Sequence, residues 1–242
     1  MKVVSPNALL RAAAELLGPV RADVTVIGAL AVQIALDGHD VALTPTGDID
    51  AGTSIERANR VVAHLEASGL KRSPEPHERR FTWIRGDLKV QLVRAFHPFP
   101  KPPANGFPVN NLVAELGRYR WGVAFEGAPD ERVFWAATPA AVVALKEEAF
   151  GRTRPITEEP VDRDFSDVAL LLDNEGERIA REVAGDAQMR ARVRRAAERL
   201  GGEAEALEGA VRQLAASGQE QTPREAEAMV RRACNDFIAD LV

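Results

Sequence analysis

Residues 44–52 read TPTGDIDAG, and they place two aspartates one residue apart directly after a glycine. In a strand, alternate side chains share a face, so Asp48 and Asp50 would point the same way while Ile49 points into the core. Two carboxylates held this close repel each other unless a cation lies between them, and Mg²⁺ prefers such hard oxygen ligands. The segment therefore predicts half of a metal site or, as the structural alternative, a solvated acidic turn beside Gly47.

The segments on both sides of this stretch predict a mixed α/β (α+β) fold. A β-branched run predicts a buried strand that ends at Gly28, and an apolar helix follows it directly. Further along, two extended runs are joined by Gly86 and Asp87, which is the pattern of a hairpin. In chain order we expect a helix at 5–17, a strand at VTVIG (24–28), a helix at ALAVQIALDG (29–38), a helix at 55–69, strands at 81–85 and 88–96, and extended segments at 121–127 and 131–137.

The character of the chain changes at Thr138, where strand signals end. Thr138 is expected to cap a helix that has Pro139 in its first position. The sequence thus predicts two domains, an α/β domain over 1–137 and an all-helical domain over 138–242. The later helices are expected at 164–173, 175–184, 186–200, 203–216 and 223–241.

Composition sets further bounds on the class of protein. The chain has 242 residues, 45% hydrophobic and 28% charged, with a net charge of −5, so it is globular and not basic as a whole. Its one cysteine permits no intramolecular disulfide and no cysteine zinc site. No apolar run is long enough to span a membrane, and the N-terminus lacks a signal-peptide pattern, so we expect a cytoplasmic protein with no membrane association.

Three pieces taken together resemble the nucleotidyltransferase superfamily of the polymerase-β type, particularly its minimal and abortive-infection (AbiEii-like) toxin branches. They are IGALAVQIALDG, TPTGDIDAG and GDLKVQLV, in this order. The later stretch from the helix TPAAVVALKEEAFG to RDFSDVALLL is similar to the part of that family in which a lysine-bearing helix precedes Arg and then R/K-D-x-x-D. The resemblance spans roughly residues 24–172 and implies a nucleotidyltransferase-type mixed sheet followed by a helical bundle.

The resemblance implies a Mg²⁺-dependent transfer of a nucleoside monophosphate from an NTP to a hydroxyl group on RNA, protein or a small molecule. It also implies a possible tRNA acceptor and a cognate toxin or antitoxin partner. The chemistry needs metal-bound carboxylates and a glycine turn at a helix N-terminus that receives phosphates. The residues so implied are Asp48 and Asp50 as metal ligands and catalytic groups, Lys146 and Asp164 as catalytic or positioning groups, and Gly28, Ala29, Thr46 and Arg154 as nucleotide contacts.

Three positions depart from the family pattern. Ala29 replaces a usual Gly or Ser, and Thr44 replaces a frequent Arg that would pair with phosphate. Gln91 stands where a third carboxylate is expected, and its amide brings no charge and cannot act as a base. These departures keep open an alternative, a catalytically degenerate nucleotide-binding or regulatory protein on the same fold.

Several charged residues also have purely structural explanations. Lys146 fits a solvated helix lysine, Arg154 a cation near a helix end, and Asp164 and Asp167 an N-cap and first-turn acid. The arginine-rich stretch MRARVRRAAERL (189–200) fits a solvated helix face or, alternatively, a docking surface for RNA. A third hypothesis is an interaction module built from the helical part, which predicts no binding of NTP.

Overall fold

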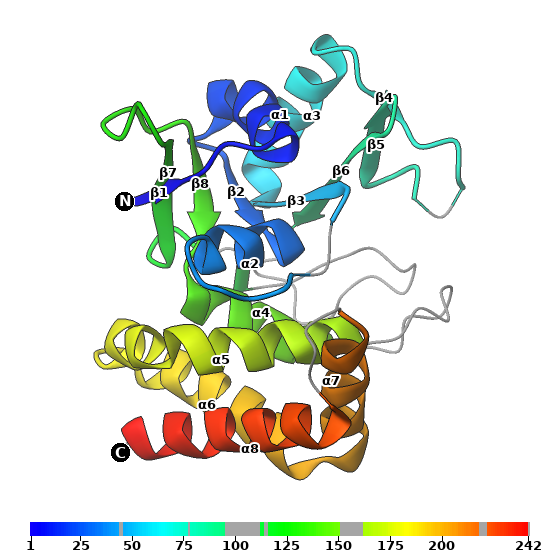
Figure 1. The fold of residues 1–242 in the computed structure, drawn as a ribbon. Helices are drawn as coiled ribbons and strands as arrows, with labels where there is room; N and C mark the ends of the chain where they lie inside the picture. Colours follow the sequence, from blue (N-terminus) through cyan, green and yellow to red (C-terminus); the bar gives the residue numbers. More distant parts are fainter. Residues whose placement is uncertain are drawn as a thin grey trace. The chain divides into compact units, whose positions relative to one another are not determined.

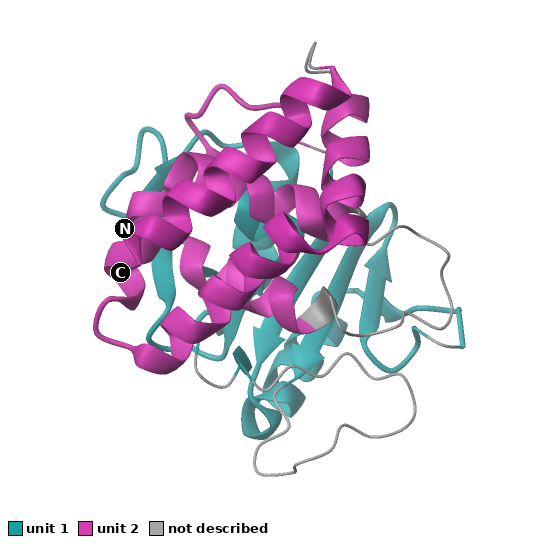
Figure 2. Cartoon of the chain, turned by 90° about the horizontal axis from the view of Figure 1, so that it is seen from below, with its two compact units in different colours: residues 1–34, 46–138 teal, residues 35–45, 139–242 magenta. Residues whose placement is uncertain are grey.

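The computed structural model describes residues 1–43, 46–76, 78–94, 112–113, 116–150, 162–217 and 222–241. The chain divides into two compact units, which Figure 2 colours separately. The first unit comprises residues 1–34 and 46–138, and the second comprises residues 35–45 and 139–242. The short segment 35–45, which precedes the two aspartates in the chain, therefore belongs with the helical unit.

The first unit is built on a mixed sheet of eight strands, as Figure 1 shows. The strand order is β1-β7-β8-β2-β3-β6-β5-β4, with parallel and antiparallel neighbours. The expected mixed α/β class is confirmed. The strands are β1 (Lys2–Val4), β2 (Val24–Ile27), β3 (Asp48–Thr53), β4 (Lys71–Arg72), β5 (Thr82–Arg85), β6 (Leu88–Arg94), β7 (Arg120–Phe125) and β8 (Phe134–Ala137).

Two amphipathic helices of the first unit lie on the same side of the sheet, α1 (Ala8–Leu17) and α3 (Ile55–Ala67) (Figure 1). A short 3₁₀ turn, η1 (Gly18–Val20), follows α1. Their buried faces meet a sheet face on which Ile49 and Trp83 are fully buried. The expectation that Ser5 begins the first helix is wrong. Asn7 is the N-cap, because its side chain accepts a hydrogen bond of 2.9 Å from the Leu10 amide.

The hairpin expected around Gly86 is present, since β5 and β6 pair antiparallel and Gly86 has φ +60°. The two edge strands β1 and β4 were not predicted, because they have three and two residues and carry too little pattern to recognise. The expected helix at 29–38 is α2 (Gly28–Leu36), which begins directly after β2. The proline-rich segment 97–108 lies outside the described residues.

The second unit is helical, as expected, and is centred on the long helix α5. This helix contacts each of the other four helices of the unit. The prediction of two helices with a break near residue 174 is wrong. Gly176 lies within α5 and packs near Phe237, where an added Cβ would make an ordinary contact of 3.8 Å with the ring. The helices are α4 (Pro139–Phe150), α5 (Asp162–Val183), α6 (Ala187–Gly202), α7 (Ala204–Ala216) and α8 (Pro223–Asp240).

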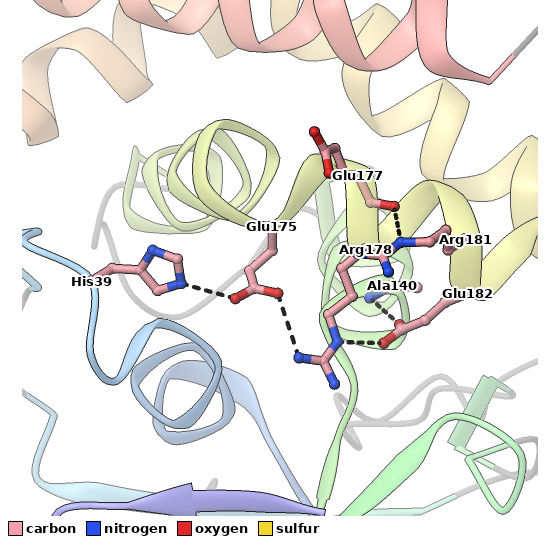
Figure 3. Close-up of polar contacts among 7 residues, drawn as sticks. All are labelled: His39, Ala140, Glu175, Glu177, Arg178, Arg181 and Glu182. Carbon is pink, nitrogen blue, oxygen red and sulfur yellow. Dashed lines mark hydrogen bonds and ion pairs between the residues drawn. The ribbon is translucent and has the colours of Figure 1, made fainter.

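A chain of polar contacts holds the segment 35–45 and helix α4 to α5 (Figure 3). His39 Nε2 lies 2.9 Å from Glu175, whose other oxygen lies 3.8 Å from Arg178. Arg178 also pairs with Glu182 at 3.2 Å, and Glu182 accepts a hydrogen bond of 3.3 Å from the Ala140 amide. Glu182 thus accepts a hydrogen bond from an amide at the start of α4 that has no partner within the helix, a role that the sequence analysis expected for Thr138.

The expected helix cap by Thr138 is therefore wrong in its chemistry, although α4 does begin at Pro139. The Thr138 hydroxyl is buried and has no hydrogen-bond partner among the described residues. The backbone amide of Thr138 donates a hydrogen bond of 2.9 Å to the Tyr119 carbonyl.

Candidate functional site

Strand β3 presents its two aspartates on one face, as the alternation in TPTGDIDAG predicts. Asp48 and Asp50 are both partly exposed, while Ile49 and Ala51 on the opposite face are fully buried. Thr46 lies at the entrance to the strand, and its hydroxyl is 3.4 Å from the Asp48 amide. The segment is therefore a strand with an open carboxylate face, and the alternative of an acidic turn is wrong.

Gly28 lies against the carboxylate of Asp50. Strands β2 and β3 pair with Ile27 opposite Asp50, so the residue after Ile27 begins its turn beside this side chain. Gly28 has φ +64°, and a Cβ at this position would lie 2.2 Å from Oδ2 of Asp50. Both the left-handed backbone and the close approach require glycine. The N-terminal turn of α2, where backbone N–H groups lack helical partners, therefore begins beside Asp50.

The neighbouring strand β6 brings two polar residues to the same sheet face. Strands β3 and β6 pair in parallel, with Gln91 beside Asp50 and Lys89 beside Asp48. Register partners in a sheet share a face. Gln91 therefore occupies the position next to Asp50 where the family resemblance implies a third carboxylate. The cation beside Asp48 was not predicted as part of the site.

Lys89 supplies positive charge to this carboxylate face. Its Nζ lies 2.7 Å from Glu78, and a quarter of its side chain is exposed. Partial burial lowers the pKa of Lys89, but the hydrogen bond to Glu78 and the charges of Asp48, Glu78 and Asp50 outweigh this effect and raise it. Strand alternation could have revealed Lys89, because once Gln91 is placed beside one aspartate, the residue two positions earlier falls beside the other.

Beside Gln91, on the next strand of the sheet, lies a hydroxyl that has no hydrogen-bond partner among the described residues. Thr82 of β5 is the antiparallel partner of Gln91, so Asp50, Gln91 and Thr82 form a row across three strands. Thr82 is fully buried, and its Oγ1 has no hydrogen-bond partner among the described residues. A buried polar atom without a partner is costly. The row therefore combines a carboxylate, an amide and a buried hydroxyl without a partner.

Lys146 and Asp164 are joined in the second unit. Nζ of Lys146 lies 2.6 Å from Asp164 and 2.8 Å from Asp167. Only 8% of the lysine side chain is exposed. Burial lowers the pKa of Lys146, but the two carboxylates outweigh that effect and raise it well above its ordinary value. Lys146 is therefore not a solvated lysine, and its charge is already matched within the unit.

Asp164 does not cap a helix, because α5 begins two residues earlier at Asp162. It lies in the first turn and directs its carboxylate to Lys146 of α4. The two groups of predicted site residues, one around Asp50 and one around Lys146, belong to different compact units. Arg154 and Thr44 lie outside the described residues.

The arginine-rich helix α6 is largely neutralised by its neighbours. Four of its arginines are paired with glutamates, two of them on α4 and two at the fourth position along the chain. This pairing weakens the expectation that the stretch 189–200 docks RNA. The pairs are Arg192–Glu148 and Arg195–Glu147 at 3.5 Å, Arg194–Glu198 at 2.8 Å and Arg199–Glu203 at 3.0 Å.

Two further features are absent from the ranges that the structure describes. In that part of the chain, no group of three or more His, Cys, Asp or Glu residues is arranged to hold a metal ion. None of the helices there has an apolar stretch long enough to cross a bilayer.

Comparison with known proteins found similarity at the level of structure. No family model matches the chain, and no curated protein matches its sequence. JHP933 from Helicobacter pylori has 13% identity and a TM-score of 0.48, over 96% of this chain and 90% of that one. A "putative nucleotidyltransferase" from H. pylori has 13% identity and a TM-score of 0.47, over 96% and 93% of the two chains. At this identity the similarity concerns the course of the chain alone.

Proposed function

We propose that this protein is a nucleotidyltransferase that moves a nucleoside monophosphate from an NTP to a hydroxyl acceptor and releases pyrophosphate. The observation that carries the proposal is the contact between the Gly28 turn and the Asp50 carboxylate. It joins a helix N-terminus suited to phosphate with a carboxylate pair suited to a cation. Position 28 requires glycine, because its backbone is left-handed and a Cβ there would collide with Asp50.

The donor set fits Mg²⁺ brought in with the nucleotide. Mg²⁺ sites of this kind use one or two carboxylates and fill their other positions with phosphate oxygens and water. Asp48 and Asp50 supply the carboxylates, and Gln91 adds an amide oxygen beside them. When bound, Mg²⁺ would neutralise the charge that develops on the phosphates and polarise the reacting phosphoryl group.

Residues of the chain have distinct roles in this proposal. The backbone amides of Gly28 and Ala29 bind the triphosphate, and Thr46 contacts it from the start of β3. Arg154 is proposed as a further phosphate contact. Lys146 and Asp164 are proposed to position the lysine-bearing helix through their ion pair, since this lysine's charge is already matched by two carboxylates. RNA, including tRNA, a protein or a small molecule could present the accepting hydroxyl, and membership of a toxin–antitoxin pair is part of the same proposal.

Calorimetric titration with each of the four NTPs, with and without Mg²⁺, tests this function. We expect binding that requires Mg²⁺ and is lost in Asp48→Asn and Asp50→Asn. Asp87→Asn is the matched control, because this aspartate lies in the exposed β5–β6 turn. If no NTP binds the wild type under any condition, or if the two site variants bind as it does, the proposal fails. If an NTP does bind in this way, transfer of radiolabel from that NTP would identify the class of acceptor.

A second candidate, a nucleotide-binding protein that does not transfer, is favoured by the residues on β6. Gln91 brings no negative charge beside Asp50, and Lys89 already places a cation beside Asp48. Both features weaken the attraction for a divalent ion. The variant Gln91→Asp separates the candidates. A gain in metal affinity together with new transfer activity would indicate a degenerate site, whereas loss of existing activity would indicate a site adapted to glutamine.

A further inference from the structure

Five arginines of the first unit gather around the start of β2 and around Trp135 of β8. We call Arg21, Arg57, Arg60, Arg120 and Arg132 the arginine cluster. They come from distant parts of the chain and are linked by contacts within the first unit. Arg21 donates a hydrogen bond of 3.0 Å to the Arg132 carbonyl, and Arg57 donates one of 2.7 Å to the Ala22 carbonyl.

The charge of this cluster is mostly uncompensated. Asp23, which is 8% exposed, lies 3.1 Å from Arg60 and 3.7 Å from Arg57. Over the described ranges it is the sole carboxylate that forms an ion pair with any of the five arginines. The cluster therefore has a local excess of positive charge in a chain whose net charge is −5. Arg192, Arg194, Arg195 and Arg199 of α6, by contrast, each pair with a glutamate.

Trp135 of β8 holds two of these arginines in place. The guanidinium carbons of Arg120 and Arg132 lie 4.5 Å and 4.2 Å from its ring centroid. Gly122, the register partner of Trp135, leaves room for Arg132, because a Cβ at that glycine would lie 2.3 Å from the arginine Nε. An aromatic face holds a guanidinium without neutralising it, so its N–H donors remain available to an anion.

The cations of this cluster also act on one another. Partial burial lowers the pKa of Arg120, and the charges of Arg57 and Arg132 lower it further. Mutual repulsion of this kind costs free energy in the free protein. An anion bound among the arginines would relieve it, which adds to the favourable free energy of binding.

We propose that the arginine cluster binds the phosphodiester backbone of a single-stranded nucleic acid. Arginine is suited to phosphate because its planar fork donates two parallel hydrogen bonds, and a group of five exceeds what one phosphate can use. Guanidinium planes also stack on unpaired bases, which favours a single strand over an acidic protein segment. Arg120 begins β7 level with Ile27, but the arginine cluster and the carboxylate site share no residue.

Fluorescence anisotropy with a short labelled RNA of mixed sequence, and a DNA of the same sequence, tests the proposal. We expect salt-sensitive binding between about 50 and 200 mM salt. The double variant Arg120→Gln/Arg132→Gln should bind about tenfold more weakly or worse, and its slope of log affinity against log salt should fall by about 1.4. The control Arg194→Gln/Arg199→Gln makes the same change of charge on α6 and should bind as the wild type does.

Substitutions of Trp135 distinguish positioned arginines from general attraction. Trp135→Leu keeps every charge but removes the aromatic face, and we expect it to weaken binding several-fold. Trp135→Phe keeps an aromatic face and should retain most of the affinity. Thermal unfolding checks that each variant is folded. RNA binding should persist in Asp50→Asn, so this proposal can survive failure of the transferase proposal. It is overturned if neither strand binds, if the α6 control loses as much affinity as the cluster variant, or if a glutamate-rich peptide binds more tightly than both strands.

Discussion

Each of the two compact units contains a cluster of two aspartates and one lysine, but the two clusters differ in burial and in charge pairing. In the second unit, Lys146 contacts both Asp164 and Asp167, and 8% of its side chain is exposed. In the first unit, Lys89 is 25% exposed and forms its ion pair with Glu78, while it influences Asp48 through charge alone. The cluster of Lys146, Asp164 and Asp167 is largely buried and its lysine contacts both aspartates, whereas the cluster of Lys89, Asp48 and Asp50 is partly exposed.

This difference shows that residue composition does not define a site. Charges that are buried and matched against one another have no capacity for a ligand, and their role is to join helices. Partly exposed carboxylates beside a glycine turn retain that capacity. We therefore expect substitutions in the second unit to change stability and those in the first unit to change binding. The following experiments test this division.

The largest effect is expected from Lys146→Met. Removal of the lysine takes away the buried cation that both Asp164 and Asp167 contact, which should lower the free energy of unfolding by about 3–5 kcal/mol. Urea denaturation measures the change. Lys89→Met is the matched control and should cost less than about 1 kcal/mol, because its ion pair is partly exposed. Equal losses in the two variants would contradict the division between the clusters.

The location of this destabilisation can be read from Cys234 in α8. Burial raises the pKa of this thiol to about 12, so the native protein should react slowly with thiol reagents near neutral pH. Lys146→Met should accelerate the reaction if it loosens the second unit, whereas Lys89→Met should not. A slow reaction in both variants would show that the buried lysine is not needed for the packing of the helices.

The stability that Lys146 provides should depend on pH only under alkaline conditions. Its pKa in the folded protein is raised above the unfolded value of about 10.4. The contribution is therefore fully present below that value and is lost as the pH rises through the folded pKa. We expect the stability difference between wild type and Lys146→Met to stay constant from about pH 7 to 9.5. A steady decline within that window would mean that the lysine is weakly held.

A smaller effect on stability is expected at the glycine of the open site. Gly28→Ala adds both left-handed backbone strain and a collision with Asp50, so it should cost about 2–3 kcal/mol in urea denaturation. Gly127→Ala is the matched control. Gly127 has φ +88°, but a Cβ at this position would have no atom within 4 Å, so the variant should show only the conformational cost of about 1 kcal/mol. Equal costs would mean that the Asp50 side chain moves away freely.

The open cluster should respond to charge in its affinity for metal. Lys89→Met removes a cation beside Asp48 and Asp50, and we expect the affinity for Mn²⁺ to rise about three- to tenfold. Electron paramagnetic resonance of free Mn²⁺ measures this without any catalytic assay. Lys71→Met, on the exposed edge strand β4, makes the same change of charge away from the pair and serves as control. A fall in affinity would show that Lys89 supports the metal site and does not compete with it.

The smallest effect is expected at Asp186, a carboxylate of the second unit with a local structural role. It caps α6 by accepting a hydrogen bond of 2.9 Å from the Met189 amide. Asp186→Ala should lower the free energy of unfolding by about 1 kcal/mol and leave Mn²⁺ affinity unchanged. A change in metal binding would show that the helical unit influences the carboxylate site.

Local patterns were sufficient wherever one element decided the outcome. The alternation in TPTGDIDAG predicted that Asp48 and Asp50 share a face, and the β-branched run ending in Gly28 predicted a strand, a turn and a helix. The change at Thr138 predicted a helical second part. Short edge strands and the continuity of α5 could not be predicted, because two or three residues carry no period and a single glycine does not decide whether a helix continues.

The sequence by itself determined the carboxylate pair, the glycine turn and the helical character of the second half, because these follow from periods of two and 3.6 residues along one segment. Tertiary structure alone decided that Lys89 lies beside Asp48 and Gln91 beside Asp50, because register between strands depends on pairing across the sheet. It also buried Lys146 between two aspartates and assembled the arginine cluster around Trp135. The fold brings together residues far apart in sequence, and electrostatic interactions depend on their distances and burial.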